Sequence, residues 1–183
     1  MIRSAQAIGV GRRDDRLAVL AKLVMGVAAL ALSAKIRIPL APVPLTLQTL
    51  AVLLVGAMLG RRAGLAAVGA YLAAGLSGLP VFASGAGPGY LLGPTGGYLL
   101  GLLPAAYLAG LAVESGLGGW RLLGGLLLAD ASVFVPGLAW LAIWQKMMTG
   151  GVSSNLLSVG LLACLPGEAV KMLVAALALR RRW

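Results

Sequence analysis

The stretch AGLAAVGAYLAAGLSGLPVFASGAGPGYLLGPTGGYLLGLLPAAYLAGLAV, residues 63–113, decides the fold class. Its 51 residues lie between Arg62 and Glu114 and contain no formally charged side chain. An α-helix rises ~1.5 Å per residue, so ~20 apolar residues cross the hydrocarbon core of a bilayer. This single run is long enough to cross twice, and it predicts an all-α integral membrane protein.

The composition of the whole chain supports that class and excludes others. Of 183 residues, 60% are hydrophobic and 11% are charged, whereas soluble domains carry about 25% charge. The chain has no histidine, one cysteine (Cys164) and no phosphate-binding loop of the G-x-x-x-x-G-K-[S/T] type. We therefore expect no enzyme activity, no catalytic residues, no metal site and no cofactor. Any ATP hydrolysis must come from another chain.

The hydropathy pattern of the whole chain predicts six transmembrane helices in a single membrane domain covering residues 1–183. A polar N-terminal segment, 1–16, precedes them. The expected spans are about 17–36, 45–59, 63–79, 95–113, 120–144 and 166–182. Three ordered loops rich in Pro and Gly connect them at 38–44, 80–94 and 147–165. Proline removes a helical hydrogen bond, which is why these segments do not read as helix interiors.

The start of the last span has two interpretations. Proline is well placed in a first helical turn, so the sixth span is expected to start at Pro166, with Glu168 at the helix N-terminus where an anion is favoured. The alternative is one helix from Asn155 that is kinked at Pro166.

The basic residues predict the orientation. One side of the six-span arrangement holds ten of them: Arg3, Arg12, Arg13, Arg16, Arg61, Arg62, Arg121, Arg180, Arg181 and Arg182. The other side holds Lys35, Arg37 and Lys146. By the positive-inside rule both termini are cytoplasmic and the three loops are external. The net charge of +10 is thus explained by a membrane surface, and no nucleic acid partner is expected. Irregular backbone is tolerated at a membrane where it lines a cavity, so we expect the loops to cover an outward-facing site.

Four motifs resemble one protein family over most of the chain, from about Leu17 to Arg182. They are IPLAPVPLTLQT (38–49), GLPVF (78–82), GPTGGY (93–98) and PGEAVK (166–171). They resemble BioY, the biotin-binding S component of energy-coupling-factor transporters. The resemblance implies a multi-pass protein of the inner (plasma) membrane that captures biotin outside. It also implies partners: a transmembrane coupling protein and two ATP-hydrolysing subunits.

Three charged residues are the main candidates for the site. Asp130 lies deep in a predicted span, where a carboxylate is expensive and is a functional hypothesis by default. It can accept from the ureido N–H groups of biotin or clasp Ser132 or Lys171. Lys171 follows Glu168 by three residues, on the same helix face, so it binds ligand or pairs with that glutamate. The family usually shows Asp where Glu168 stands.

The remaining candidates come from the loops and helix ends. Ser84 stands where family members often present an asparagine, and Thr46 and Gln48 either cap a helix or touch ligand. Gly96 shapes the start of the fourth span, where backbone N–H groups suit a carboxylate. Tyr90, Tyr98 and Trp140 are expected to wall the pocket. Trp144 and Trp183 fit an interfacial belt better.

Two rival functions stay open. One is an S component for another vitamin, with the same fold and a different pocket. The other is a self-sufficient transporter that uses Asp130 and Glu168 as proton carriers. Ala21, Ala29 and Ser33 share a face of the first span that could dock on a coupling protein, although Met25 interrupts it.

Overall fold

The computed structural model describes the backbone of residues 7–179 and the side chains of residues 17–179. The described chain is mostly helical, with one two-stranded antiparallel hairpin that pairs Arg37 with Thr46 and Ile38 with Leu45. In chain order the elements are α1 (Ala7–Lys35), β1 (Arg37–Ile38), β2 (Leu45–Thr46), α2 (Gln48–Leu59), α3 (Arg61–Leu76), α4 (Pro88–Leu91), α5 (Gly96–Glu114), α6 (Gly119–Thr149), the π-helix η1 (Ser158–Leu162) and α7 (Leu165–Ala178).

The first helix is longer than the predicted span. Residues 7–16, expected to form a polar segment, continue α1 toward the N-terminus. Hydropathy marks the part of a helix that lies in lipid, and it does not mark where the helix begins. Of the predicted basic residues, Arg3 and 180–182 lie outside the described residues, as does Trp183. The side chains of Arg12, Arg13 and Arg16 lie outside them too.

The last third of the chain also differs in its boundaries. Helix α6 extends five residues past the predicted end at Trp144, because polar Gln145 and Lys146 lower the hydropathy without ending the helix. It ends at Thr149 and is followed by Gly150, whose φ of 76° is the left-handed conformation that glycine adopts most readily. The predicted loop 147–165 therefore begins inside α6 and also contains η1. Helix α7 begins at Leu165 with its proline in the first turn.

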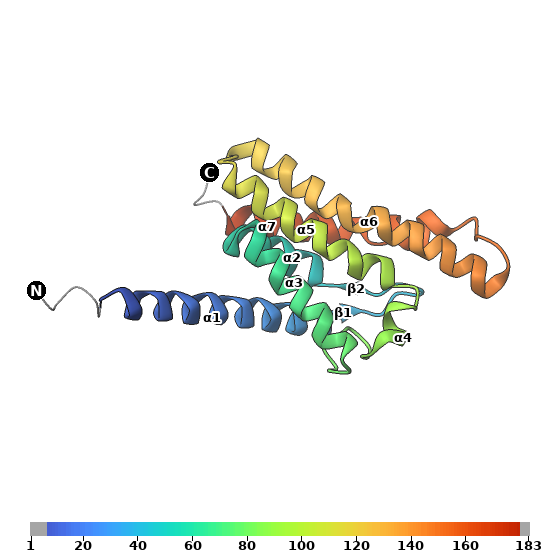
Figure 1. Cartoon of the computed structure of the whole chain (residues 1–183). Coiled ribbons are helices and arrows are strands. Elements are labelled where there is room, and N and C mark those ends of the chain that lie inside the picture. The colour runs from blue at the N-terminus through green and yellow to red at the C-terminus, as the bar shows by residue number, and fades with distance from the viewer. Residues whose placement is uncertain (1–6, 180–183) are drawn as a thin grey trace, which may run out of the picture.

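The ends of the helices fall into two groups (Figure 1). Helix α1 begins and α7 ends at one end of the bundle. The β1–β2 hairpin and α4 lie at the opposite end, together with the loops that join them to the helices. The cis peptide bond between Ala41 and Pro42 lies in the hairpin loop. The arrangement brings the predicted external loops 38–44 and 80–94 to one end of the molecule.

Small residues allow the helices to approach closely. A Cβ atom at Gly97 would collide with the backbone of Pro136 and with Trp140, and one at Gly101 would crowd Val133. Gly56 lies equally close to the backbone of Ala106. Such contacts are typical of membrane helices, which pack through small residues. They bring α5 against both α6 and α2.

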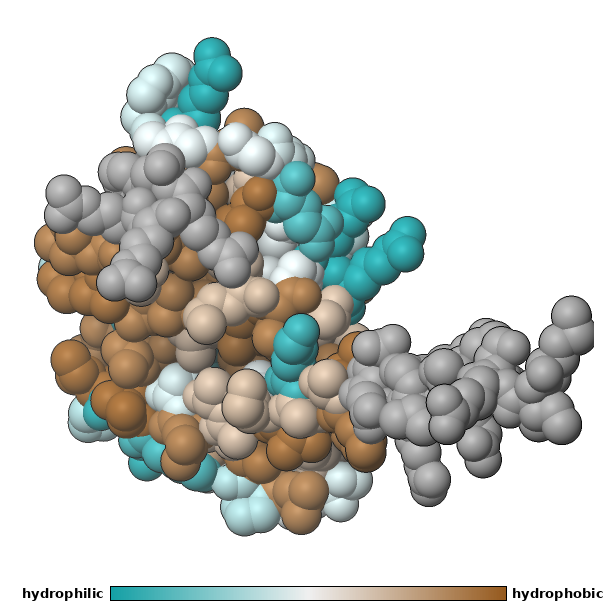
Figure 2. All heavy atoms as spheres, turned by 90° about the vertical axis from the view of Figure 1, so that its left-hand side faces the viewer, coloured by the Kyte–Doolittle hydropathy of each residue, from teal (hydrophilic) through white to brown (hydrophobic). Residues whose placement is uncertain are grey.

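The outer surface of the bundle is strongly apolar. Within the described residues, four helical segments are long and apolar enough to cross a membrane: Leu17–Lys35, Gly96–Glu114, Gly119–Thr149 and Ser158–Ala178. Helix α2 has 12 residues and α3 has 16, so the count of six spans stays a prediction. Figure 2, which faces the end of the bundle where α1 begins, shows hydrophobic residues over much of the described part of that face, with hydrophilic groups in separate patches. Leu32, Val135 and Val170 are each more than 60% exposed, which suits contact with lipid.

Candidate functional site

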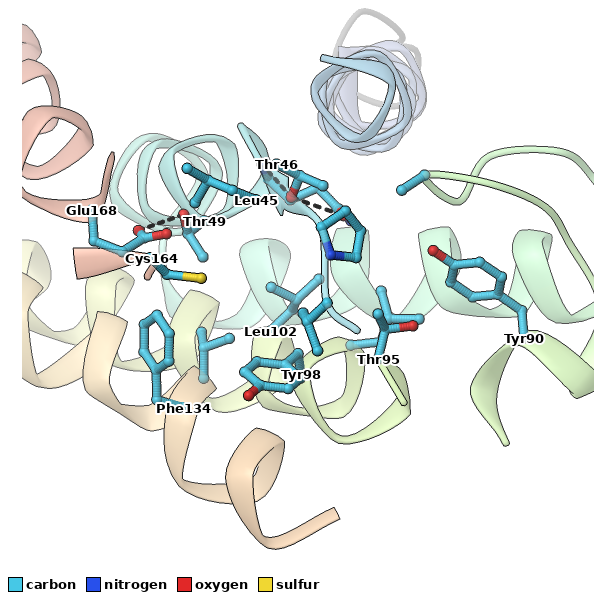
Figure 3. Close-up of a pocket in the computed structure, with 16 residues that line it drawn as sticks. Leu45, Thr46, Thr49, Tyr90, Thr95, Tyr98, Leu102, Phe134, Cys164 and Glu168 are labelled. Atoms are coloured by element: carbon cyan, nitrogen blue, oxygen red, sulfur yellow. Dashed lines mark hydrogen bonds between the residues drawn. The ribbon is translucent and has the colours of Figure 1, made fainter. Parts of the chain in front are cut away.

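A pocket opens between the β1–β2 hairpin, α2, α5, α6 and the start of α7 (Figure 3). The space between its walls is about 560 Å³ when the part that is open to solvent is counted. The lining is mainly apolar and aromatic. It consists of Val43, Pro44, Leu45, Thr46, Gln48, Thr49, Ala83, Tyr90, Thr95, Tyr98, Leu99, Leu102, Val133, Phe134, Cys164 and Glu168.

One end of the pocket carries a buried charged cluster. Lys171 Nζ donates to Glu168 Oε1 at 2.6 Å and to Thr49 Oγ1 at 3.0 Å. Thr49 Oγ1 in turn donates to Glu168 Oε2 at 2.8 Å. Helix α7 places the lysine and the glutamate one turn apart, and α2 supplies the threonine. Both charged residues are less than 10% exposed, and only Glu168 and Thr49 line the pocket.

Asp130 lies next to this cluster, on α6. Its carboxylate is repelled by Glu168 and attracted by Lys171. It is 8% exposed, and its Oδ1 has no hydrogen-bond partner among the described residues. The clasp with Ser132 is not formed, because the Ser132 hydroxyl donates to the Ala129 carbonyl oxygen of its own helix. Lys171 forms its ion pair with Glu168 and none with Asp130 among the described residues, which leaves the cluster with one carboxylate oxygen that has no partner.

A neutral polar network forms a second part of the wall. Gln48 Nε2 donates to the hydroxyl of Tyr71 at 2.9 Å, and that hydroxyl donates to the Val81 carbonyl oxygen at 3.2 Å. The Thr46 hydroxyl contacts both the side chain and the backbone N–H of Gln48. Thr46 and Gln48 therefore stabilise the start of α2 and also face the pocket, so the two predicted roles coincide.

Aromatic side chains form the rest of the wall. The Tyr98 hydroxyl donates to the Gly160 carbonyl oxygen of η1 at 2.8 Å, and its ring packs edge-on against Phe134. Tyr90 stacks on Phe82 with the ring centroids 5.0 Å apart. In the view of Figure 3, Glu168 and Thr49 lie on one side of the space and Tyr90 on the other. Ser84 does not line the pocket and lies 3.4 Å from the Tyr90 hydroxyl.

Trp140 and Gly96 do not line the pocket. Both make structural contacts near the start of α5. The indole N–H of Trp140 donates to the Gly93 carbonyl oxygen at 2.8 Å. A side chain at Gly96 would collide with the Leu91 carbonyl group and crowd that same indole. The two residues hold the turn between α4 and α5, which carries the pocket residue Thr95.

The predicted site residues thus fall into three sets. Those that line the pocket are Thr46, Gln48, Tyr90, Tyr98 and Glu168. Asp130 and Lys171 do not line it and interact with Glu168, and Ser84, Gly96 and Trp140 contact the segments that carry the wall. Sequence reasoning missed Thr49 and Tyr71. Thr49 sits in the quoted run TLQT, and a hydroxyl in the first turn of the otherwise apolar helix α2 was the available signal.

The arrangement suits a small, mostly apolar ligand with polar groups at its ends. Apolar and aromatic walls with a few placed polar groups are typical of small-molecule sites. The carboxylates of Glu168 and Asp130 accept hydrogen bonds, and the Gln48 amide and Thr49 hydroxyl both donate and accept. Among the described residues no group of His, Cys, Asp and Glu side chains has an arrangement that could hold a metal ion.

Comparison with known proteins identifies the family to which this arrangement corresponds. The model of the BioY family matches residues 7–183. Among solved structures, the fold is similar to that of the S component for biotin from an ECF-type ABC transporter, with a TM-score of 0.75 and 27% identity. That similarity covers 92% of both chains.

Curated relatives carry the same family name. A biotin transporter BioY of Thermotoga maritima is 47% identical over 88 residues, which are 48% of this chain and 52% of that protein. The corresponding transporter of Rhodobacter capsulatus is 36% identical over 156 residues, or 75% of this chain and 77% of that protein. The matches to the T. maritima protein and to a probable biotin transporter of Lysinibacillus sphaericus span about half the length of each relative.

Proposed function

The chain belongs to the BioY family, and from this premise we propose that it is the biotin-capturing S component of an energy-coupling-factor transporter. In this role it binds biotin with high affinity at the outer face of the cell (plasma) membrane and performs no chemistry on it. The observation that carries the proposal is the mainly apolar and aromatic pocket with the Glu168 carboxylate in its wall, within a fold that is similar to that of a biotin S component over 92% of the chain.

The chemistry of biotin is compatible with both the apolar part and the polar part of the pocket wall. Its fused rings and aliphatic chain are apolar, and they match the surface formed by Tyr98, Leu102 and Phe134. Its ureido group carries two N–H donors and a carbonyl acceptor. Glu168 offers a carboxylate acceptor in the pocket wall, and the Gln48 amide offers a donor and an acceptor, so both complement that group.

Transport needs a source of energy that this chain does not supply, since its sequence has no nucleotide-binding loop. The partners proposed for it are a transmembrane coupling protein and two ATPase subunits. The predicted cytoplasmic side, rich in arginine, would face the ATPases. The face of α1 with Ala21, Ala29 and Ser33 is the proposed contact with the coupling protein. The exposure of Ala21 and Ala29 supports this contact, whereas Ser33 is buried, donates to the Leu30 carbonyl oxygen and is not free to take part.

The experiment is equilibrium binding of labelled biotin to the purified protein in detergent, with thiamine and riboflavin as competitors. Tight binding that only unlabelled biotin displaces is the expected result. Displacement of the label by thiamine or riboflavin would indicate that the protein binds another vitamin. No binding by folded protein would refute the capture role, and uptake that depends on the proton gradient but not on ATP would establish the proton-coupled alternative.

A further inference from the structure

The last residue of α1 holds the segment that carries part of the pocket wall. Lys35 Nζ donates to the Phe82 carbonyl oxygen at 2.7 Å, although 47 residues separate the two in sequence. The bond joins the end of α1 to the loop between α3 and α4, at the end of the bundle where the hairpin lies (Figure 1). It lies outside the pocket lining, so no ligand contact explains it.

Phe82 is the residue through which this loop is anchored. It is fully buried, and its ring packs so closely on Gly75 that a Cβ atom there would collide with it. The ring stacks on Tyr90, which lines the pocket, and the next residue in the chain, Ala83, lines it as well. The position of Phe82 therefore sets the position of two wall residues.

Two side chains hold consecutive carbonyl groups of this segment from different directions. The Tyr71 hydroxyl, bonded to Gln48 of the pocket, donates to Val81, and Lys35 donates to Phe82. A hydrogen bond from an ammonium group is stronger than one between neutral groups. No described carboxylate lies within ion-pair distance of Lys35, so the carbonyl is the partner that the structure gives this charge.

We propose that Lys35 is a positioning residue that latches the Phe82 segment, keeps Ala83 and Tyr90 against the pocket, and slows the escape of bound ligand. The identity of the ligand rests on the proposed function, whereas the latch itself does not. Because Lys35 ends α1, the latch also ties the position of that helix to the closure of the pocket.

The test compares Lys35→Met with Lys22→Met, which removes an exposed lysine of the same helix. The first measurement is hydrogen exchange in the ligand-free protein. In Lys35→Met the backbone amides of residues 81–90 exchange about tenfold faster, equivalent to ~1.4 kcal/mol, while those of α5 are unchanged. Lys22→Met behaves as wild type, and Lys35→Arg, which keeps a charged donor, restores most of the protection. Lys35→Gln, too short to reach, takes the place of the methionine variant if that variant does not fold.

The second measurement is the dissociation rate of biotin, expected to rise about tenfold in Lys35→Met and to recover in Lys35→Arg. Unchanged exchange at 81–90 would overturn the latch, whatever the ligand. Faster exchange in α5 as well would overturn it in favour of general destabilisation. Faster exchange at 81–90 with unchanged biotin dissociation would overturn the role in retention. Failure of the wild type to bind biotin would refute the proposed function, while the exchange data would still decide the latch.

Discussion

Removing the ammonium group of Lys171 is the sharpest perturbation of the buried cluster. Lys171 is 6% exposed and bonds to both Glu168 and Thr49. In Lys171→Met, Glu168 loses the cation paired with it and Asp130 loses a nearby positive charge, while both carboxylates are less than 10% exposed. Breaking a buried ion pair by deleting one partner costs ~3–5 kcal/mol.

That cost translates into a measurable shift of the unfolding temperature. For a chain of this size ~1 kcal/mol corresponds to ~2–4 °C, so we expect Lys171→Met to unfold about 10 °C below wild type in detergent. Removing the opposite charge as well should relieve much of the loss. In Lys171→Met/Glu168→Gln the amide still accepts a hydrogen bond from Thr49, and at least half of the shift is expected to recover.

Lys146→Met is the matched control, because this exposed lysine on α6 has no hydrogen bond or ion pair among the described side chains. It should unfold within about 2 °C of wild type. The reasoning is wrong if Lys171→Met unfolds with the control, or if the double variant is no more stable than the single one. Either result would mean that solvent already screens the cluster.

The other predictions concern Asp130 in the charged cluster, the hydrogen bond from Trp140 to Gly93 and the close packing of α2 against α5. Asp130→Asn keeps the size of the side chain and an acceptor but removes a charge, so biotin should bind at least tenfold more weakly, or ~1.4 kcal/mol; wild-type affinity in a titration would exclude Asp130 from the site. Trp140→Phe loses the bond to the Gly93 carbonyl oxygen and should lower the unfolding temperature by ~2–4 °C through the loss of ~1 kcal/mol; no change in a melting curve would show that the bond adds no stability. Gly56→Ala places a Cβ atom against the backbone of Ala106 and should destabilise the protein by ~1–3 kcal/mol. Its control, Gly69→Ala, meets no atom within 4 Å and should be neutral or stabilising by up to ~1 kcal/mol, and equal melting temperatures for the two would contradict the close α2–α5 approach.

The helices of the bundle were largely predictable, and their ends were less so. Apolar runs between charges and prolines mark where a chain can lie in lipid, which is why the expected segment 95–113 lies close to α5 (Gly96–Glu114). Helix α6 continues through Gln145 and Lys146 although the polarity of these residues suggests an end. Backbone hydrogen bonds set where a helix stops, and hydropathy reports only the solvent around it.

The candidate site was partly predictable, for a related reason. Charged residues within apolar helices stand out in a sequence, so Asp130, Glu168 and Lys171 could be singled out without a structure. Trp140 was expected to wall the pocket, but its indole N–H donates to the Gly93 carbonyl group. A sequence indicates which aromatic residues lie near a site, and it does not show which way their polar atoms point.

By itself the sequence determined the class of the protein, because the lack of charge over residues 63–113 leaves a bilayer as the natural environment. It also determined the family, through motifs long enough to be distinctive. Only the tertiary structure decided that Thr49 bridges Glu168 and Lys171 across 119 and 122 residues of chain. It was also needed to show that Lys35 donates to the Phe82 carbonyl group and that one oxygen of Asp130 has no partner among the described residues. Such contacts depend on how helices distant in sequence rotate and approach one another, and those rotations are set by close packing at residues such as Gly56, Gly97 and Gly101.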